Sequence, residues 1–362
     1  MLPRALLVTG AALLLGGCAQ IGYYAQAVHG EMSVLHAARP IDDVMNDPGA
    51  DASLKARLGK VKEIRAFAVA ELDLPDNRSY STYADLKRPY VLWNVVATPE
   101  LSLTPIHWCF PVAGCVSYRG YYHEQAAQEF AAQLRAEGDD VLVGGVPAYS
   151  TLGWFNDPVL STFIDYSDAE LARMLFHELA HQLIYVKNDS QFNESFATTV
   201  EEEGLERWLA AHGEAGQREA YALRRERRQG FLNLLLSNRK KLEMSYASEA
   251  SDDDKRARKA EVFREMRDEY QVLKAGWNGY SGYDTWFVEP LSNARFASVA
   301  TYHDLVPAFK ALLAQQGSFP AFYDAVRRLA ALGKAERHRR LALLMGPIAA
   351  DDGRNKGEDK SE

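Results

Sequence analysis

The sequence predicts a mainly helical protein of the α+β class, with a small β-sheet and a long helical-hairpin arm. Three observations support this. Apolar residues recur at helical spacing in several segments, and β-branched and aromatic residues gather in Tyr90–Ala97. The highly charged stretch 214–274 keeps apolar residues at intervals of three and four. This last pattern predicts two long antiparallel helices that turn near Asp252–Asp254.

The other elements follow from local patterns in chain order. Two helices are expected between 21 and 72, interrupted by Pro40 and by Asp47-Pro48-Gly49. A capping box, Ser167-Asp168-Ala169-Glu170, begins a helix that runs to about Lys187. The remaining predictions are a helix over 124–136, a buried strand over 140–143, an extended segment over 148–152, and helices over 193–211 and 306–332.

Two basic clusters occur in the charged stretch, Arg224–Arg228 and Lys255–Lys259. They are open to two interpretations, a functional basic patch or a solvated helix face. Glutamates are interleaved with them, which favours the solvated face. The net charge of −8 also argues against a nucleic-acid partner, which usually needs a basic surface.

The N-terminus predicts export. Arg4 precedes an apolar run from Ala5 to Leu15 that is too short to span a bilayer, which takes ~20 apolar residues. Residues 1–17 are therefore expected to be a signal peptide. The residues before Cys18 resemble a bacterial lipobox, which implies lipidation of Cys18, and Ala19 rather than Asp after it implies an outer-membrane lipoprotein facing the periplasm. The alternative is an ordinary signal cleaved near a chance cysteine.

The two remaining cysteines, Cys109 and Cys115, lie six positions apart with Pro111 and Gly114 between them. In an oxidising compartment this spacing predicts a local disulfide. Metal-binding thiolates are the alternative, but the sequence holds no further cysteine partners for them.

His177-Glu178-Leu179-Ala180-His181 is the H-E-x-x-H pattern, ten residues into the capped helix. The spacing of four puts both imidazoles on one helix face, where they can reach one ion. Catalytic zinc takes three protein ligands and keeps one position open. Glu178 is then the general base that acts on a water. The alternative is a pair of surface histidines beside a solvated glutamate.

The third ligand is suggested by a resemblance. Asn193-Glu194-Ser195-Phe196-Ala197 is similar to the third-ligand segment of gluzincins, the superfamily that includes thermolysin and the aminopeptidase N type. This implies that Glu194, thirteen positions after His181, is the carboxylate ligand. It also implies a zincin-like metallopeptidase fold. The loop between the two helices is longer in those two families, so the resemblance implies a more compact branch.

The wider pattern includes the Cys109–Cys115 loop, Tyr118-Arg119-Gly120 and Tyr149–Trp154. It resembles, over nearly the whole mature chain, a group of bacterial lipoproteins classed as "putative aminopeptidases". The resemblance implies zinc-dependent hydrolysis of a peptide substrate in the cell envelope. The chain then divides into a signal peptide (1–17), an N-terminal helical and sheet region (18–155), a zinc peptidase region (156–350) that includes the arm, and a disordered tail (351–362).

Two supporting roles have competing candidates. Glu201, seven positions after Glu194, either orients a ligand imidazole or is an exposed member of an acidic run. Related gluzincins stabilise the oxyanion with a downstream Tyr or His, which implies Tyr302 with His303 as its neighbour. The competitors are Tyr280 and Tyr283.

An aminopeptidase also needs an acid for the substrate ammonium. The Gly-x-Met-Glu-Asn segment of aminopeptidase N enzymes is absent, and Asp157 or Glu124 are candidate substitutes. Without such an acid the same site would serve an endopeptidase.

A rival of another class is a lipid-anchored zinc-binding assembly protein without turnover. Tyr118, Trp154 and Trp277 would be its contact residues. Glu178 argues against this rival, because a non-catalytic site does not need a base. Nothing in the sequence identifies a protein partner.

Overall fold

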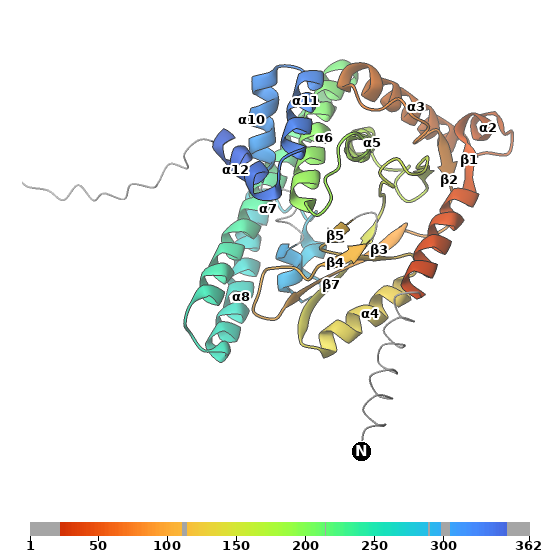
Figure 1. Cartoon of the computed structure of the whole chain (residues 1–362). Coiled ribbons are helices and arrows are strands. Elements are labelled where there is room, and N and C mark those ends of the chain that lie inside the picture. The colour runs from red at the N-terminus through yellow and green to blue at the C-terminus, as the bar shows by residue number, and fades with distance from the viewer. Residues whose placement is uncertain (1–21, 111–113, 214, 289, 298–304, 346–362) are drawn as a thin grey trace, which may run out of the picture.

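The fold comes from a computed structural model that describes residues 22–110, 114–213, 215–288, 290–297 and 305–345. Several predicted features lie outside the described residues: the signal peptide with Cys18, the candidates Tyr302 and His303, and the tail over 351–362. Figure 1 shows the course of the described chain, with α4 (Glu124–Ala136) against the small central sheet and α5 (Asp168–Leu183), α6 (Ser190–His212), α10 (Val306–Gln316) and α11 (Phe319–Ala330) gathered on the other side of it.

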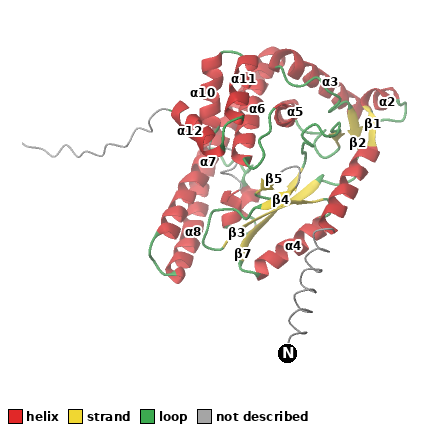
Figure 2. Cartoon of the chain, viewed as in Figure 1, coloured by secondary structure: helices red, strands yellow, loops and turns green. Residues whose placement is uncertain are grey.

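The structure is mainly helical with small sheets (Figure 2), which confirms the α+β class. A first helix covers 22–37. The longer elements that follow are α2 (Ile41–Asn46), α3 (Ala52–Leu72), α4 (Glu124–Ala136), α5 (Asp168–Leu183), α6 (Ser190–His212), α7 (Ala215–Ala247), α8 (Asp252–Gly276), the 3₁₀ helix η1 (Asp284–Phe287), α10 (Val306–Gln316), α11 (Phe319–Ala330) and α12 (Lys334–Leu344).

The strands form three small sheets within the described residues. In the largest, β3 (Leu92–Pro99) lies between β6 (Arg119–Tyr121) and β7 (Asp139–Val146), and both pairings are antiparallel. Helix α4 packs on this sheet through Ala127, Ala131 and Leu134. The second sheet joins β1 (Ala38–Pro40), β2 (Thr82–Ala84) and β8 (Val159–Leu160), and the third pairs β4 (Trp108–Phe110) with β5 (Gly114–Val116).

Local breaks account for the differences from the predicted elements. The helix expected over 306–332 is two helices, because Gly317 adopts a left-handed conformation (φ 73°) that ends α10. The region 21–72 holds three helices rather than two. The extended segment over 148–152 is a loop, because Pro147 has no N–H to continue the ladder of β7 and Leu152 has a positive φ of 57°.

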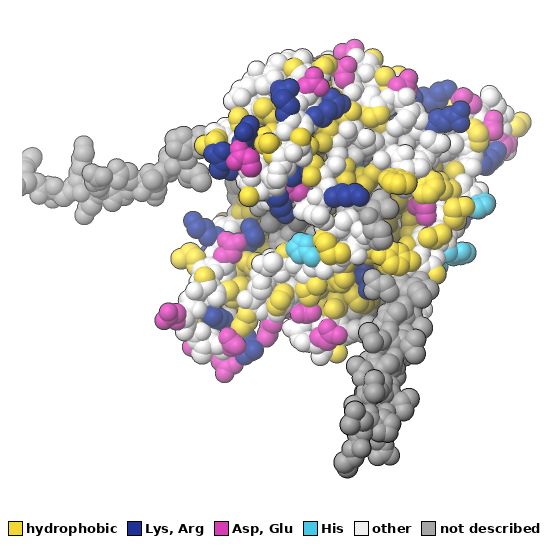
Figure 3. Space-filling model, in the orientation of Figure 1, with side chains coloured by type: hydrophobic (Ala, Val, Ile, Leu, Met, Phe, Trp, Pro, Cys, Tyr) yellow, Lys and Arg dark blue, Asp and Glu magenta, His cyan; other side chains and the backbone are white. Residues whose placement is uncertain are grey.

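Helices α7 and α8 lie side by side (Figure 1) and enclose an apolar core that includes Phe231, Leu242 and Met266. Acidic residues pair with the basic ones, as Glu265 does with Lys241 (2.8 Å). In Figure 3 both signs of charge are intermixed over this face of the hairpin, which favours the solvated-face interpretation. Lys259 also pairs with Asp140 of β7 (2.7 Å), so α8 contacts the central sheet.

The main apolar core lies around α5 and α6, which α3, α10 and α11 surround. Its fully buried members include Phe176 on α5 and Phe196 on α6. Phe196 stacks on Phe322 of α11, with ring centroids 5.9 Å apart. The two helices that carry the predicted ligands are therefore held from several sides. Among the described helices, none combines the length and the apolar character of a membrane span.

Candidate metal centre

Helix α5 carries two parallel stripes of residues. Ser167 caps its N-terminus, where the hydroxyl accepts a hydrogen bond from the backbone N–H of Glu170 (3.4 Å). One stripe is fully buried in the core: Leu171, Ala172, Leu175, Phe176, Leu179 and Ala180. The other lines a cavity of about 590 Å³: Arg173, Met174, His177, Glu178 and His181. The helical repeat thus puts the residues that pack in the core on one face of α5 and the residues that line the cavity on another.

Helix α6 presents a second stripe to the same cavity. Its N-cap is the buried Asp189, and Glu194, Thr198 and Glu201 follow at intervals of four and three. Asn193 joins the first turn of α6 to the loop that precedes it. Its side-chain amide exchanges two hydrogen bonds with the backbone of Val186, each 2.8 Å long. These two hydrogen bonds close the short loop between α5 and α6.

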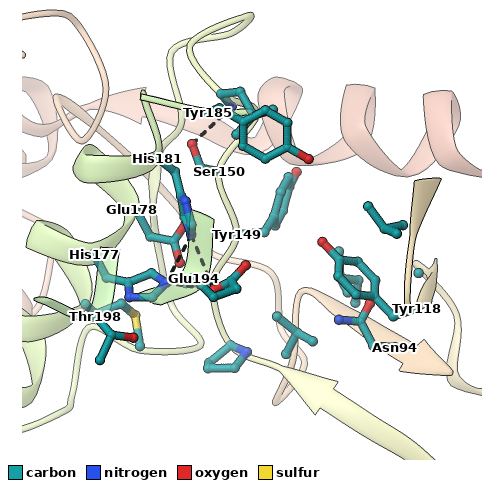
Figure 4. Close-up of a pocket in the computed structure, with 18 of the residues that line it drawn as sticks. Asn94, Tyr118, Tyr149, Ser150, His177, Glu178, His181, Tyr185, Glu194 and Thr198 are labelled. Atoms are coloured by element: carbon teal, nitrogen blue, oxygen red, sulfur yellow. Dashed lines mark hydrogen bonds and ion pairs between the residues drawn. The ribbon is translucent and has the colours of Figure 1, made fainter. Parts of the chain in front are cut away.

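Three candidate ligand atoms converge between the helices (Figure 4). His177 Nε2 lies 3.1 Å from His181 Nε2, and Glu194 Oε2 lies 3.3 Å from the first nitrogen and 3.5 Å from the second. Two ligands bound at ~2.05 Å to a tetrahedral ion are about 3.3 Å apart. The three predicted residues therefore have the spacing that a single metal ion requires.

The hydrogen bonds of His177 agree with this assignment. Its Nδ1 donates to Oε2 of Glu201 at 2.8 Å, because a carboxylate can only accept. In the neutral ring, the form that binds a metal, the lone pair of His177 Nε2 then lies toward Glu194 and His181. A cation would satisfy these three electron-rich atoms together.

The electrostatics of the cluster favour positive charge. Burial by itself would lower the pKa of His177, but the carboxylates of Glu194 and Glu201 outweigh it and raise the pKa to about 10. Burial acts to raise the pKa of Glu194, yet the two imidazoles hold it well below its ordinary value. A metal ion would take the place of the proton that these groups share.

Glu201 lies behind the first ligand. It is 2% exposed, and its second oxygen accepts a hydrogen bond from Arg173 at 2.8 Å. Burial would raise the pKa of Glu201, but Arg173 and His177 lower it to about 2, so this carboxylate stays ionised. Of the two alternatives for Glu201, the geometry favours orientation of the His177 ring over an exposed surface position.

Glu178 lies in the cavity beside the three candidate ligands (Figure 4). Burial raises the pKa of its carboxyl group above the ordinary value, although the imidazoles of His177 and His181 act in the opposite direction. A carboxylate with a raised pKa is a stronger base, so the environment suits proton transfer.

The opposite walls of the cavity come from the N-terminal half of the chain. Helix 22–37, the strands β3, β5 and β6, and the segment after β7 all contribute. Aromatic and apolar side chains dominate these walls: Tyr23, Leu92, Phe110, Val116, Tyr118, Tyr122, Val146, Pro147, Tyr149 and Leu152. Tyr185, in the loop after α5, also lines the cavity. The predicted disulfide Cys109–Cys115 is present and closes the hairpin of β4 and β5.

Several predicted site residues lie elsewhere. Tyr283 stacks on Phe231 of α7, with ring centroids 4.1 Å apart, and neither it nor Tyr280 lines the cavity. Glu124 begins α4 and is exposed. Asp157 is 3% exposed.

Asp157 is engaged in the loop that follows β7. It accepts hydrogen bonds from the N–H and the hydroxyl of Thr151 and from Gln182 of α5. Burial is the main cause that raises its pKa to about 6, against the hydrogen bonds of Thr151. Asp157 therefore fixes the cavity wall and does not face the substrate space.

Other contacts at the cavity had no signal in the sequence. The hydroxyls of Tyr122 and Tyr149 both bind the carboxylate of Glu31, which ties helix 22–37 to the wall. Arg173 on α5 donates a hydrogen bond to Glu201 on α6. Each contact joins residues that are at least 28 positions apart, and no repeat or motif in one segment reveals its partner.

The fold and the site together define a class: a helical α+β protein whose cavity holds a His–His–Glu cluster suited to one metal ion, with a further buried carboxylate beside it. A family model makes the assignment specific. The chain belongs to the family described as "Putative aminopeptidase", whose model matches residues 22–341. This match supports a peptidase function.

Comparisons with curated proteins and with solved structures gave no significant match. The zincin-like fold, the gluzincin type and the projecting arm therefore stay predictions.

Proposed function

We propose that this protein is a zinc-dependent peptidase of the aminopeptidase type that acts in the cell envelope. The observation that carries the proposal is the convergence of His177, His181 and Glu194 within one cavity, with Glu178 beside them. The family match supports peptide hydrolysis as the reaction.

Zinc is the metal that suits these donors. Two imidazoles and one carboxylate are the ligand set of several catalytic zinc sites, which keep a fourth position for water or substrate. The cavity lies on the side of the cluster away from the helix core, where that position would open. Glu201 would hold the His177 ring through its Nδ1 proton.

The protein's own residues account for the proton transfers. A bound zinc ion would supply Lewis acidity to the substrate carbonyl and to the attacking water. Glu178 takes a proton from the water as its oxygen bonds to the carbonyl carbon. When the C–N bond breaks, the same carboxyl group gives this proton to the leaving amine. The raised pKa of Glu178 suits both steps.

The size of the cavity favours a short peptide or a chain end. Its volume of about 590 Å³ lies within the ~300–1,000 Å³ of small-ligand sites. Among the described lining residues the carboxylates are Glu178, Glu194 and Glu201, and each already has a role in the cluster. The described lining residues include no separate acid, so a substrate ammonium would have to pair with one of these three carboxylates.

The proposed activity predicts that a peptide with a free amine is cleaved, and that its N-acetylated twin is cleaved at least ~10-fold more slowly, because a charged contact in a closed site discriminates strongly. Both reactions should stop with a chelator and resume with zinc. The measurement is product analysis by mass spectrometry over a time course.

Equal rates on the two peptides, or internal cuts in a long chain, would assign the same chemistry to an endopeptidase. No turnover of a mixed peptide library by the zinc-loaded protein would contradict the peptidase proposal and favour the non-catalytic envelope protein.

For the location we propose a lipid anchor at Cys18, from the lipobox resemblance. Cys18→Ser removes the thiol that would carry the lipid, so the protein should leave the membrane fraction or remain unprocessed. Fractionation of cells with detection of the mature and precursor forms measures this. A fully processed Cys18→Ser protein that still sediments with outer membranes would contradict the anchor.

A further inference from the structure

Tyr118 lies in the wall of the cavity that faces the candidate ligands. It follows β5 by two residues and directly precedes β6. Val116, Tyr118 and Gly120 all line the cavity, so this segment runs along its wall. The chain bends at Ser117 between the two strands, and Tyr118 is among the residues that face the cavity. In Figure 4 its hydroxyl is at the end of the ring nearer to Glu194.

The segment around Tyr118 is held on both sides. The Cys109–Cys115 disulfide closes the hairpin before it, and the pairing of Arg119 with Val95 attaches the chain after it to β3. The backbone N–H of Cys115 also donates to Oδ1 of Asn188 at 2.7 Å. Asn188 lies in the loop between α5 and α6, so the hairpin is fixed directly to the connection between the two ligand-bearing helices.

The fit between hairpin and loop is close. Gly114 has a φ of +76°, and a Cβ added there would lie 2.5 Å from Oδ1 of Asn188. A side chain at this position would therefore push the hairpin away from the loop. The position of Tyr118 relative to the cluster is set by these contacts and not by a flexible loop.

The direction from which Tyr118 approaches matches a chemical need of the reaction. His177, His181 and Glu194 reach the metal position from α5 and α6, so a substrate carbonyl can approach only from the cavity. The oxygen that gains negative charge in the transition state then lies on the cavity side. A donor for it has to come from a wall other than the two ligand helices, as Tyr118 does.

From this arrangement we infer that Tyr118 is a catalytic residue, whose hydroxyl donates a hydrogen bond to the oxyanion during peptide hydrolysis. The inference rests on the proposed peptidase function. Water adds to the carbonyl carbon, the C=O π electrons move to the oxygen, and Glu178 takes the proton of the water. Tyr118 transfers no proton. It stabilises the charged oxygen until the C–N bond breaks and the carbonyl forms again.

The environment keeps Tyr118 a donor. Burial, and after it the negative charge of Glu194, raises the pKa of Tyr118 above its ordinary value, so the hydroxyl stays protonated at neutral pH. The Tyr118 hydroxyl donates no hydrogen bond to any of the described residues. Tyr149, which lines the same cavity, instead donates to Glu31 and is committed to the wall.

The test compares Tyr118→Phe with Tyr121→Phe in the zinc-loaded full chain. Both variants lose one hydroxyl from the same strand region, but Tyr121 packs beneath α4 and does not line the cavity. Tyr118→Phe should lower kcat ~100-fold with KM changed less than ~3-fold, because the contact forms only in the transition state. Its affinity for a phosphinic peptide, a tetrahedral analogue measured by calorimetry, should also fall ~100-fold. Tyr121→Phe and the zinc content of both variants should match the wild type.

The outcomes separate this inference from the proposed function. If Tyr118→Phe stays within ~3-fold of the wild type in kcat and in analogue affinity, the inference is wrong, while wild-type turnover leaves the peptidase proposal intact. If Tyr302→Phe instead loses kcat and analogue affinity, the oxyanion donor is Tyr302, as the family resemblance implies. A wild-type protein that neither cleaves peptides nor binds the analogue would overturn the function and this inference with it.

Discussion

Glu178→Gln is expected to lower turnover by ~10²-fold or more while the zinc stays bound. Glutamine keeps the shape and the volume of the side chain, but its amide cannot take a proton from water. The expected loss corresponds to at least ~2.7 kcal/mol of transition-state stabilisation. Steady-state kinetics on a cleaved free-amine peptide and metal analysis of the same preparation measure the two quantities.

The half-buried position of Glu178 in the cavity makes this prediction specific. The carboxyl group lies in the cavity beside the three candidate ligands, and burial raises its pKa. Glu203→Gln is the matched control, because Glu203 lies on α6 and pairs with Arg207 at the surface (3.1 Å). Its turnover should equal the wild type. Wild-type turnover in Glu178→Gln as well would assign the proton transfers to another residue.

His181→Ala is expected to abolish stoichiometric zinc binding and, with it, activity. The wild type should hold about one zinc per chain, since three ligands converge on one point. Without His181 the remaining two ligands cannot complete the set, and the alanine leaves a gap of the size of an imidazole. Metal analysis after gel filtration in zinc-free buffer measures the occupancy.

Zinc affinities of further variants distinguish a metal ligand from a residue that only orients a ligand. Glu201→Gln keeps a hydrogen-bond acceptor for His177 Nδ1 but removes the negative charge, so zinc affinity should fall by ~10–100-fold without loss of the site. His29→Ala removes an exposed imidazole from helix 22–37 and should bind zinc as the wild type does. A full equivalent of zinc in His181→Ala would show that the metal binds elsewhere.

Local patterns were sufficient for the elements that carry the chemistry. The capping box at Ser167 predicts where α5 begins, and the spacing of four puts His177 and His181 on one face of any helix built there. The short spacing of Cys109 and Cys115 likewise predicts their disulfide. These features depend on neighbours within about two helical turns, so the sequence contains all the information they need.

The surroundings of the site needed the tertiary structure. Whether Glu201 is exposed or buried depends on how α6 packs against α5, and this packing brings Oε2 of Glu201 to 2.8 Å from His177 Nδ1. The sequence predicts an extended segment over Ala148–Leu152, but the structure has a loop there. The hydrogen bond from Thr151 to Asp157 holds this loop, and the residues 148–152 alone do not reveal it.

The sequence by itself thus predicted the class of the fold and the disulfide, which the structure confirms, and three candidate ligands with a candidate base. Only the tertiary structure decided which walls enclose them. The cavity brings Tyr118 and the Glu31–Tyr149 contact to a site built on α5, from segments 28 or more residues away from His177. Such contacts arise from the packing of several elements at once, and no periodicity within one segment specifies which distant side chain will lie opposite.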